Sequence, residues 1–405
     1  MAADIEALRD DLASAVHASG AANDHVFAAL RTVPRHVFLP DVPPEEAYRD
    51  DAIVTKRNAD GQPISSSSQP TLMAIMLRQL DIEPGARVLE IGAGTGYNAA
   101  LLAHLVGPSG HVVTVDIDQD VAVRARANLA AAGFPDVTVI CADGAAGYAP
   151  AAPYDRIIAT VGVWDLEPAW LDQLTATGRI VVPLDLRGVH RSIAFERAGD
   201  HWTSRSVMPC GFMRIRGSAA GPEWVRVLAT ESELTLTVPD PHDGLDAAAL
   251  LAAWDAPGVD VDTGVVTDQQ QVSDGLCLWL AMHEPRWCIV SERTRTPSRL
   301  RRAPLGVQDL GLTVGLIEGT SVAELAWAPD GPTLTATGHG DRGAGLAADL
   351  VGQVRAWDAA GRPGTRGLRI DAYPKPAPDG RAADAIEKTH TMLVLSRTAP
   401  PENEA

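Results

Sequence analysis

Cysteine is scarce in this sequence: four cysteines occur among 405 residues, and they lie far apart. No two of them form a C-x-x-C pair, and no histidine stands near one at the spacing of a metal ligand. Three of the four lie in apolar runs, where a free cysteine behaves as a small hydrophobic side chain. The sequence therefore predicts neither a disulfide framework nor a metal site.

Positive charge and long apolar runs are also lacking. Lys and Arg number 34 against 52 Asp and Glu, which gives a formal net charge of -18 at pH 7. Because nucleic acids and acidic membranes are bound by clustered cations, we expect neither as a partner. No run reaches the roughly 18 apolar residues of a membrane span. The N-terminus, M-A-A-D-I-E-A-L-R-D, does not resemble a signal peptide, so we expect a cytoplasmic protein.

The length predicts two domains. Apolar residues at helical spacing indicate a helical arm over residues 1–35, and short apolar runs alternate with Ala-rich helical segments over 85–210. This alternation predicts an α/β fold, a doubly wound, Rossmann-like parallel sheet covered by helices. The composition changes at residues 217–222, G-S-A-A-G-P. We expect domains at 1–217 and 218–405, the second of them α+β, with one of its strands at 276–281.

A glycine-rich turn is the most informative local feature. The apolar strand that ends in Glu90-Ile91 is followed by Gly92, Gly94 and Gly96 in a G-x-G-x-G pattern. Glycines at such a turn let the backbone approach a ligand closely and adopt positive φ. A dinucleotide-binding enzyme, which uses a related turn, is the alternative. However, an acid beside the turn does not suit a pyrophosphate, whereas it is compatible with S-adenosylmethionine, which has no phosphate.

Two further strands end in acids, which favours the same cofactor. Asp116 follows the second strand twenty residues after Gly96, where a carboxylate can accept from both ribose hydroxyls. Ile117 is placed in the same site. Asp143 ends the third strand and is expected to accept from the adenine amino group, while Gly144 keeps the backbone close to the ring. The sequence therefore predicts an S-adenosylmethionine-dependent methyltransferase domain.

Several motifs over about residues 20–216 resemble the protein L-isoaspartyl O-methyltransferase family. They are R-H-x-F-L-P at 35–40, R-D-D-A at 49–52, G-Q-x-I-S at 61–65, G-x-G-Y at 94–97, Y-D-R-I-I-A-T at 154–160 and G-R-I-V-V-P at 178–183. The resemblance implies methyl transfer to a carboxylate in a peptide chain. Such a carboxylate is already ionised at neutral pH, so the enzyme must align it rather than deprotonate it.

The resemblance also implies that the active-site serine lies just after Ile64. The family has one serine between this isoleucine and the Gln-Pro step, whereas this chain has four, at 65–68. Alignment from the left selects Ser65 and alignment from the right selects Ser68, so both stay candidates. The alternative interpretation of the run is a serine loop with one helix cap. Trp164 and Asp165 follow the fourth strand, where ligand loops lie in doubly wound folds.

The serine run and the large second domain resemble actinobacterial family members that act on ribosomally made peptides. That resemblance implies methylation of an Asp side chain in a constrained peptide such as a lanthipeptide precursor, leading to aspartimide and then isoaspartate. The alternative is repair methylation of L-isoaspartyl residues in damaged proteins. A third hypothesis is a cofactor-binding scaffold without activity. The second domain has three open roles: substrate recognition, formation of a homodimer, or covering of the active site.

Overall fold

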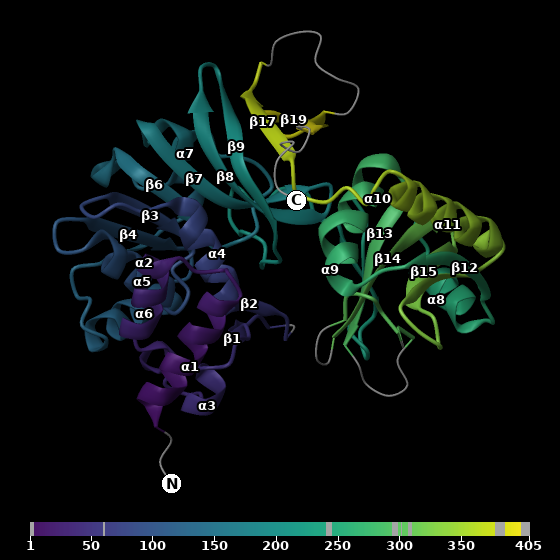
Figure 1. Ribbon diagram of the computed structural model, residues 1–405, viewed down its shortest axis with the longest axis horizontal. Coiled ribbons are helices and arrows are strands. Elements are labelled where there is room, and N and C mark those ends of the chain that lie inside the picture. Colours follow the sequence, from purple (N-terminus) through teal and green to yellow (C-terminus); the bar gives the residue numbers. More distant parts are fainter. Residues whose placement is uncertain are drawn as a thin grey trace. The chain divides into compact units, whose positions relative to one another are not determined.

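A computed structural model describes residues 4–59, 61–239, 245–293, 299–300, 302–306, 310–376 and 385–397 (Figure 1). The chain forms two compact units. Unit 1 comprises Met1–Asp185, His190–Gly221 and Arg369–Ser396, and unit 2 comprises Leu186–Val189, Pro222–Leu368 and Arg397–Ala405. Among the described residues, no helix is both long enough and apolar enough to cross a membrane.

Unit 1 begins with the expected helical arm. Its elements are α1 (Ile5–Ala18), α2 (Asp24–Thr32), η1 (Arg35–Phe38) and α3 (Pro44–Ala47). Asp4 and Asn23 cap the first two helices by accepting from backbone N–H groups, which explains where these helices begin. Leu12, Val16 and Leu30 are buried in one core with residues of the sheet and its helices, so the arm packs as part of the unit.

A ten-stranded sheet organises unit 1, in the order β18-β19-β17-β9-β8-β7-β6-β3-β4-β5. The strands β3 to β7 pair in parallel, and the β8–β9 and β9–β17 pairs are antiparallel. The strands are β3 (Arg87–Ile91), β4 (His111–Asp116), β5 (Thr138–Cys141), β6 (Tyr154–Ala159), β7 (Leu174–Leu186), β8 (Val189–Ala198), β9 (His201–Pro209), β17 (Leu368–Pro374), β18 (Ile386–Glu387) and β19 (Thr391–Arg397). The predicted α/β fold with a parallel, doubly wound sheet is confirmed.

Helices connect the parallel strands, and a small hairpin precedes them. The helices are α4 (Pro70–Leu80), α5 (Tyr97–Val106), α6 (Gln119–Ala131), α7 (Pro168–Asp172) and the short turns η2 (Gly144–Ala146) and η3 (Ala149–Ala151). The hairpin pairs β1 (Ile53–Arg57) with β2 (Pro63–Ser67), so the serine run is largely a strand. Because α4 begins at Pro70, directly after Gln69, the hairpin leads straight into a helix start.

The chain returns to unit 1 near its C-terminal end, which differs from the expected boundary. The first crossing near residue 221 agrees with the composition change, but β17 pairs with β9 and joins the large sheet, as Figure 1 shows. Asp371 lies opposite Thr203 and Ala372 lies opposite Trp202 in this pairing. Strand pairing over such a separation depends on tertiary contacts, so composition alone did not indicate it.

Unit 2 is an α+β unit built on an antiparallel sheet of seven strands, β10-β11-β13-β14-β15-β16-β12. They are β10 (Val225–Ala229), β11 (Leu234–Thr237), β12 (Val259–Val266), β13 (Trp287–Arg293), β14 (Leu310–Glu318), β15 (Ser321–Trp327) and β16 (Thr333–His339). Its helices are α8 (Ala247–Asp255), α9 (Gln269–Gln271), the π-helical η4 (Val272–Leu276), α10 (Cys277–His283) and α11 (Gly343–Ala359). The expected strand at 276–281 is wrong, since these residues are helical. Short apolar runs suit either structure.

Candidate active site

The glycine turn leaves the carboxyl end of β3 and enters α5. Gly92, Gly94 and Gly96 all have positive φ, at 102°, 52° and 89°. A Cβ at Gly92 would lie 2.8 Å from Oγ1 of Thr160, and one at Gly94 would lie 3.3 Å from the carbonyl oxygen of Ser66. The backbone therefore requires glycine at this turn, both for its conformation and for space.

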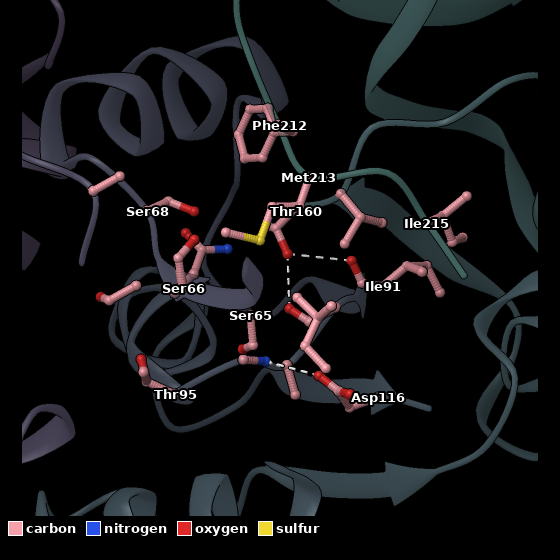
Figure 2. Close-up of a pocket in the computed structure, with 18 of the residues that line it drawn as sticks. Ser65, Ser66, Ser68, Ile91, Thr95, Asp116, Thr160, Phe212, Met213 and Ile215 are labelled. Atoms are coloured by element: carbon pink, nitrogen blue, oxygen red, sulfur yellow. Dashed lines mark hydrogen bonds between the residues drawn. The ribbon is translucent and has the colours of Figure 1, made fainter. Parts of the chain in front are cut away.

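One cavity of about 260 Å³ lies over this turn in unit 1 (Figure 2). It is bounded by the glycine turn, the end of β4, the serine run, the end of β6 and the segment that follows β9. The lining residues that matter below are Ser65, Ser66, Ser67, Ser68, Gly92, Gly94, Asn98, Asp116, Ile117, Gly144, Thr160, Val161, Met213, Arg214, Ile215 and Arg216. The structure thus brings together segments that the sequence analysis had connected only by motif.

Asp116, the last residue of β4, faces this cavity beside the turn. Its Oδ2 accepts from the backbone N–H of Gly94 at 3.0 Å, and its Oδ1 accepts from that of Asp118 at 3.1 Å. Burial raises the pKa of the Asp116 carboxyl, and the two backbone bonds oppose that rise. Because each carboxylate oxygen can accept a second bond, Asp116 keeps capacity for two hydroxyl donors. The neighbouring Ile117 also lines the cavity.

Glu90 is fully buried and is not among the residues that line the cavity. It accepts from Nδ2 of Asn98 at 2.7 Å and from Oγ1 of Thr114 at 2.6 Å. Burial raises its pKa to about 7, against the hydrogen bonds that favour the ionised form. The expected direct contact of Glu90 with a cofactor is therefore replaced by a role in joining α5 to β4, since Asn98 is the residue that reaches the cavity.

Asp143 and Gly144 separate in the structure. Gly144 lines the cavity, whereas Asp143 is not among the lining residues. The Asp143 Oδ1 accepts from Ala145 N–H at 3.0 Å, and Oδ2 accepts from the N–H and hydroxyl of Ser218 at 2.8 and 2.9 Å. Although burial opposes it, these bonds lower the pKa of Asp143. Its carboxylate thus holds the segment after β9, which differs from the expected contact with an adenine amino group.

The serine run presents different faces of β2 to its surroundings. The hydroxyl of Ser65 accepts from Oγ1 of Thr55 at 3.3 Å, across the hairpin. Ser67 also lines the cavity, but its Oγ is buried and has no hydrogen-bond partner among the described residues. Among the described residues, the hydroxyls of Ser66 and Ser68 form no hydrogen bond, and both residues lie beside the cavity in Figure 2. The structure therefore adds Ser66 to the predicted candidates, and the alternation of a strand was the signal for it.

A cluster of ion pairs ties the hairpin to the cofactor side of the cavity. Lys56 on β1 lies 2.9 Å from Oδ2 of Asp118 and 2.6 Å from Oδ1 of Asp120. Arg216, from the segment after β9, lies 2.7 Å from the same Oδ2 of Asp118. The Arg216 bond, and then Lys56, hold the pKa of Asp118 below its usual range. This cluster, Lys56, Asp118, Asp120 and Arg216, is called the Asp118 hub below.

Comparison with known proteins agrees with this geometry. The family model for protein-L-isoaspartate(D-aspartate) O-methyltransferase matches residues 7–219, just over half of the chain. The chain belongs to this family. The methyltransferase is accordingly an enzyme with S-adenosylmethionine as its cofactor. Within the described residues, no group of three or more His, Cys, Asp and Glu forms a metal site.

Relatives of the methyltransferase share its first unit at moderate identity. It is 38% identical over 211 residues to a protein-L-isoaspartate O-methyltransferase of Hyperthermus butylicus, covering 50% of this chain and 85% of that protein. It is 42% identical over 159 residues to protein-L-isoaspartate O-methyltransferase 2 of Archaeoglobus fulgidus, covering 39% of this chain and 70% of that protein. Each alignment covers half of this chain or less.

A solved structure shares the fold over a longer stretch. The structure of a protein-L-isoaspartate O-methyltransferase covers 90% of this chain and 96% of its own, with a TM-score of 0.51 and 22% identity. A match of that length reaches well past residue 221. The fold of the second unit is therefore not peculiar to this methyltransferase.

Proposed function

We propose that this enzyme methylates the carboxylate of an aspartyl-type residue in a peptide. The observation that carries the proposal is that the serine run and the glycine turn line one cavity. A methyl donor and a carboxylate acceptor bound together in this cavity would therefore be close both to residues that can hold the donor and to hydroxyls that can orient the acceptor. We also propose that the enzyme works in the cytoplasm, where such peptides are made and where proteins age.

The residues around the cavity fit S-adenosylmethionine. Asp116 retains acceptor capacity for the ribose hydroxyls, and the glycines of the turn leave the backbone open to close approach. Ile117 and Gly144 line the same cavity as apolar or backbone surface for the adenine. When bound, this cofactor supplies a methyl group on a cationic sulfur, which leaves as a neutral thioether when the acceptor oxygen bonds to the methyl carbon.

The enzyme's own residues then have an alignment task and no proton to move. The acceptor is an ionised carboxylate at neutral pH, so the new C–O bond forms without a general base. Beside the cavity, Ser66 and Ser68 have hydroxyls with no partner among the described residues, and Ser65, which accepts from Thr55, keeps its own O–H as a donor. A donated hydrogen bond orients an anion without neutralising it. Arg214 and Arg216 add positive charge to the opposite segment, although Arg216 is already paired with Asp118.

For the acceptor, we propose an Asp side chain in a constrained peptide of the lanthipeptide type. The three additional serines support this proposal, because they change the part of the cavity that contacts the acceptor in the family's common pattern. The methyl ester is a better leaving group than a carboxylate, so the following backbone nitrogen can attack it to form an aspartimide. Hydrolysis of that ring then yields aspartate or isoaspartate.

The second candidate is repair methylation of L-isoaspartyl residues in damaged proteins. The names of the two relatives described above support it. Both candidates share the same chemistry at the carboxylate. They differ in whether the acceptor is a side chain in a cyclised peptide or the main-chain carboxylate beside a β-linked residue. A role of unit 2 in substrate recognition or in a homodimer stays a prediction.

Competition between the two acceptors decides between the candidates. The full chain is incubated with labelled S-adenosylmethionine, a linear L-isoaspartyl peptide and a thioether-cyclised peptide that contains Asp, and both methyl esters are quantified by mass spectrometry. We expect the larger kcat/KM for the cyclised Asp peptide. Faster methylation of the linear isoaspartyl peptide would transfer the proposal to repair, and methylation of neither would refute peptide carboxyl methylation by this chain.

Substitution along the serine run tests the alignment role. We expect Ser66→Ala combined with Ser68→Ala to lower kcat/KM for the acceptor at least about 10-fold, because a bond to a charged group contributes about 1.5 to 3 kcal/mol. The affinity for S-adenosylhomocysteine, measured by calorimetry, should change less than about 3-fold. Ser67→Ala is the matched control on the same strand, and an equal loss in that variant would contradict the assignment.

A further inference from the structure

Asp165, in the loop after β6, binds the C-terminal part of the chain. Its carboxylate is 3% exposed and accepts from the backbone N–H groups of His390 and Thr391 and from the Thr391 hydroxyl. The Leu166 N–H, at 2.8 Å, is a fourth donor. A buried carboxylate is stable only when donors of this kind surround it. The sequence analysis placed Asp165 in a ligand loop, and in the structure its carboxylate holds the turn between β18 and β19.

Lys388 lies in that same turn and is fully buried. Its Nζ is 3.1 Å from Oδ1 of Asp185, at the end of β7, and 3.3 Å from the centre of the Trp164 ring. The chain contains three lysines, and all of its other Lys and Arg residues are arginines. A buried lysine is therefore unusual in this sequence. The Asp185 carboxylate and the Trp164 ring both stabilise the buried cation. Lys388 thereby joins the end of β7 to the loop that follows β6.

The loop that these contacts fix is joined to the wall of the cavity. Thr160 and Val161 line the cavity directly. Two residues later, the Gly162 N–H donates to the carbonyl of Met213 at 2.7 Å, and the Ile215 N–H donates to the carbonyl of Gly162 at 2.8 Å. Met213 and Ile215 both line the cavity, as Figure 2 shows. An unbroken set of contacts thus runs from the C-terminal turn to the wall at 211–216.

We propose that Asp165, Lys388 and Thr391 are positioning residues for methyl transfer. In this proposal the C-terminal strands hold the loop at 160–165, and this loop sets the wall at 211–216 against which the acceptor carboxylate is aligned. The family match ends at residue 219, so Lys388 and Thr391 lie outside the part of the chain that it covers. The inference rests on the proposed function for its kinetic part only.

A pair of substitutions at one residue tests the proposal in the full chain. Thr391→Val removes the hydroxyl bond to Asp165 with little change of shape, and Thr391→Ser keeps it. We expect Thr391→Val to lower kcat/KM for the peptide acceptor about 5- to 10-fold, and Thr391→Ser to stay within about 2-fold. Lys375→Met, at a partly exposed lysine paired with Glu387, is the control within the same segment.

Two measurements separate positioning from a loss of folded protein. Activity is normalised to the sites that bind S-adenosylhomocysteine, counted by calorimetric titration, and its Kd should stay within about 2-fold because the glycine turn and Asp116 are not contacted by the C-terminal turn. Normalised kcat/KM values that are equal for Thr391→Val and Thr391→Ser would overturn the positioning role. A loss confined to the number of binding sites would overturn it as well.

Hydrogen exchange tests the coupling independently of any acceptor. We expect Thr391→Val, compared with Thr391→Ser, to speed amide exchange about 5-fold or more in peptides that cover 160–165 and 211–216, with no change across β3 and β4. Unchanged exchange at 211–216 would refute the coupling. If the wild-type chain methylated no peptide carboxylate, the proposed function would fail, while exchange would still decide whether the C-terminal turn holds the wall.

Discussion

Glu90 illustrates at the residue scale how burial changes the role of a side chain. A strand-end acid beside a glycine turn suggests a ligand, but β3 is the central parallel strand and its last carboxylate is enclosed. Asn98 and Thr114 satisfy both of its oxygens. Because its pKa is about 7, Glu90 is partly protonated near neutral pH. It is linked to the cavity through its hydrogen bond with Asn98, which lines the cavity.

The stability of unit 1 should depend on pH through Glu90. In the folded protein the pKa of Glu90 is about 7, above the ordinary value of 4.5. Between pH 4.5 and pH 7 the folded protein therefore keeps a proton on Glu90 that the unfolded chain has lost. Stability therefore falls as pH rises from about 4.5 to 7, by roughly 3 kcal/mol from this group. Glu90→Gln mimics the protonated form and should remove that part of the dependence.

Thermal unfolding at pH 5 and pH 8 provides the measurement. The Tm of unit 1 should fall more between these values in the wild type than in Glu90→Gln, because only the wild type must ionise a buried carboxyl. Asp4→Asn, at an exposed helix cap, serves as the comparison. Parallel pH profiles for wild type and Glu90→Gln would show that Glu90 is already ionised at pH 5.

The hairpin of β1 and β2 is the element that carries most of the serine run, and few of its residues are buried. Of its ten residues only Ile53 and Ser67 are buried. The Asp118 hub supplies a second attachment, because Lys56 reaches across to the loop that follows β4. The charged cluster thus places the serines relative to Asp116 and the glycine turn, although none of its ion pairs contacts a reacting atom.

Lys56→Met should loosen this attachment. The pairs are partly exposed, with 27% of the Lys56 side chain and 18% of the Asp118 side chain open to solvent. We therefore expect a modest effect, with the KM of the acceptor raised about 2- to 5-fold, and a smaller difference from wild type at high salt because salt screens the wild-type pairs. The neighbouring Arg57→Met is the control, since the one bond of Arg57 among the described residues goes to the Gly61 carbonyl within the hairpin. Equal effects in both variants would contradict the role of the hub.

At the scale of the whole molecule, each unit has hydrophobic clusters of its own. Unit 1 is centred on a cluster that includes Leu77, Val88 and Leu101, and unit 2 has a separate cluster that includes Trp287 and Trp357. The cofactor site and the acceptor serines belong to unit 1 alone. A ligand of the cavity should therefore shift the unfolding of unit 1, whereas a core substitution in unit 2 should shift the unfolding of unit 2.

Calorimetric scans of the full chain should show two transitions. S-Adenosylhomocysteine at 100 times its Kd stabilises unit 1 by about 2.7 kcal/mol and should raise only that transition. Trp357→Ala removes a fully buried ring from unit 2 at a cost of about 3 to 5 kcal/mol, which should lower the other transition by about 10 °C. A single transition that both changes move together would show that the units unfold as one.

Sequence reasoning and structure agree most closely where the signal is local. The G-x-G-x-G turn, Asp116 after its strand and the capped helices of the arm each depend on neighbours within a few residues. Disagreement appears where a distant partner decides. Asp143 accepts hydrogen bonds from Ser218, and Asp165 accepts from Thr391. The apolar run at 276–281 is helical in unit 2. In each case the competing partner was not readable from local spacing.

The sequence by itself determined the family, the cofactor and the order of strands and helices in the methyltransferase unit, because periodicity and backbone demands at glycines are local properties. Only the tertiary structure decided which serine hydroxyls remain open, that Glu90 acts through Asn98, and that Arg369–Ser396 completes unit 1. These outcomes depend on burial and on hydrogen bonds between segments up to 226 residues apart. Such contacts form only when the whole sheet is assembled, because they join segments that lie far apart in the sequence.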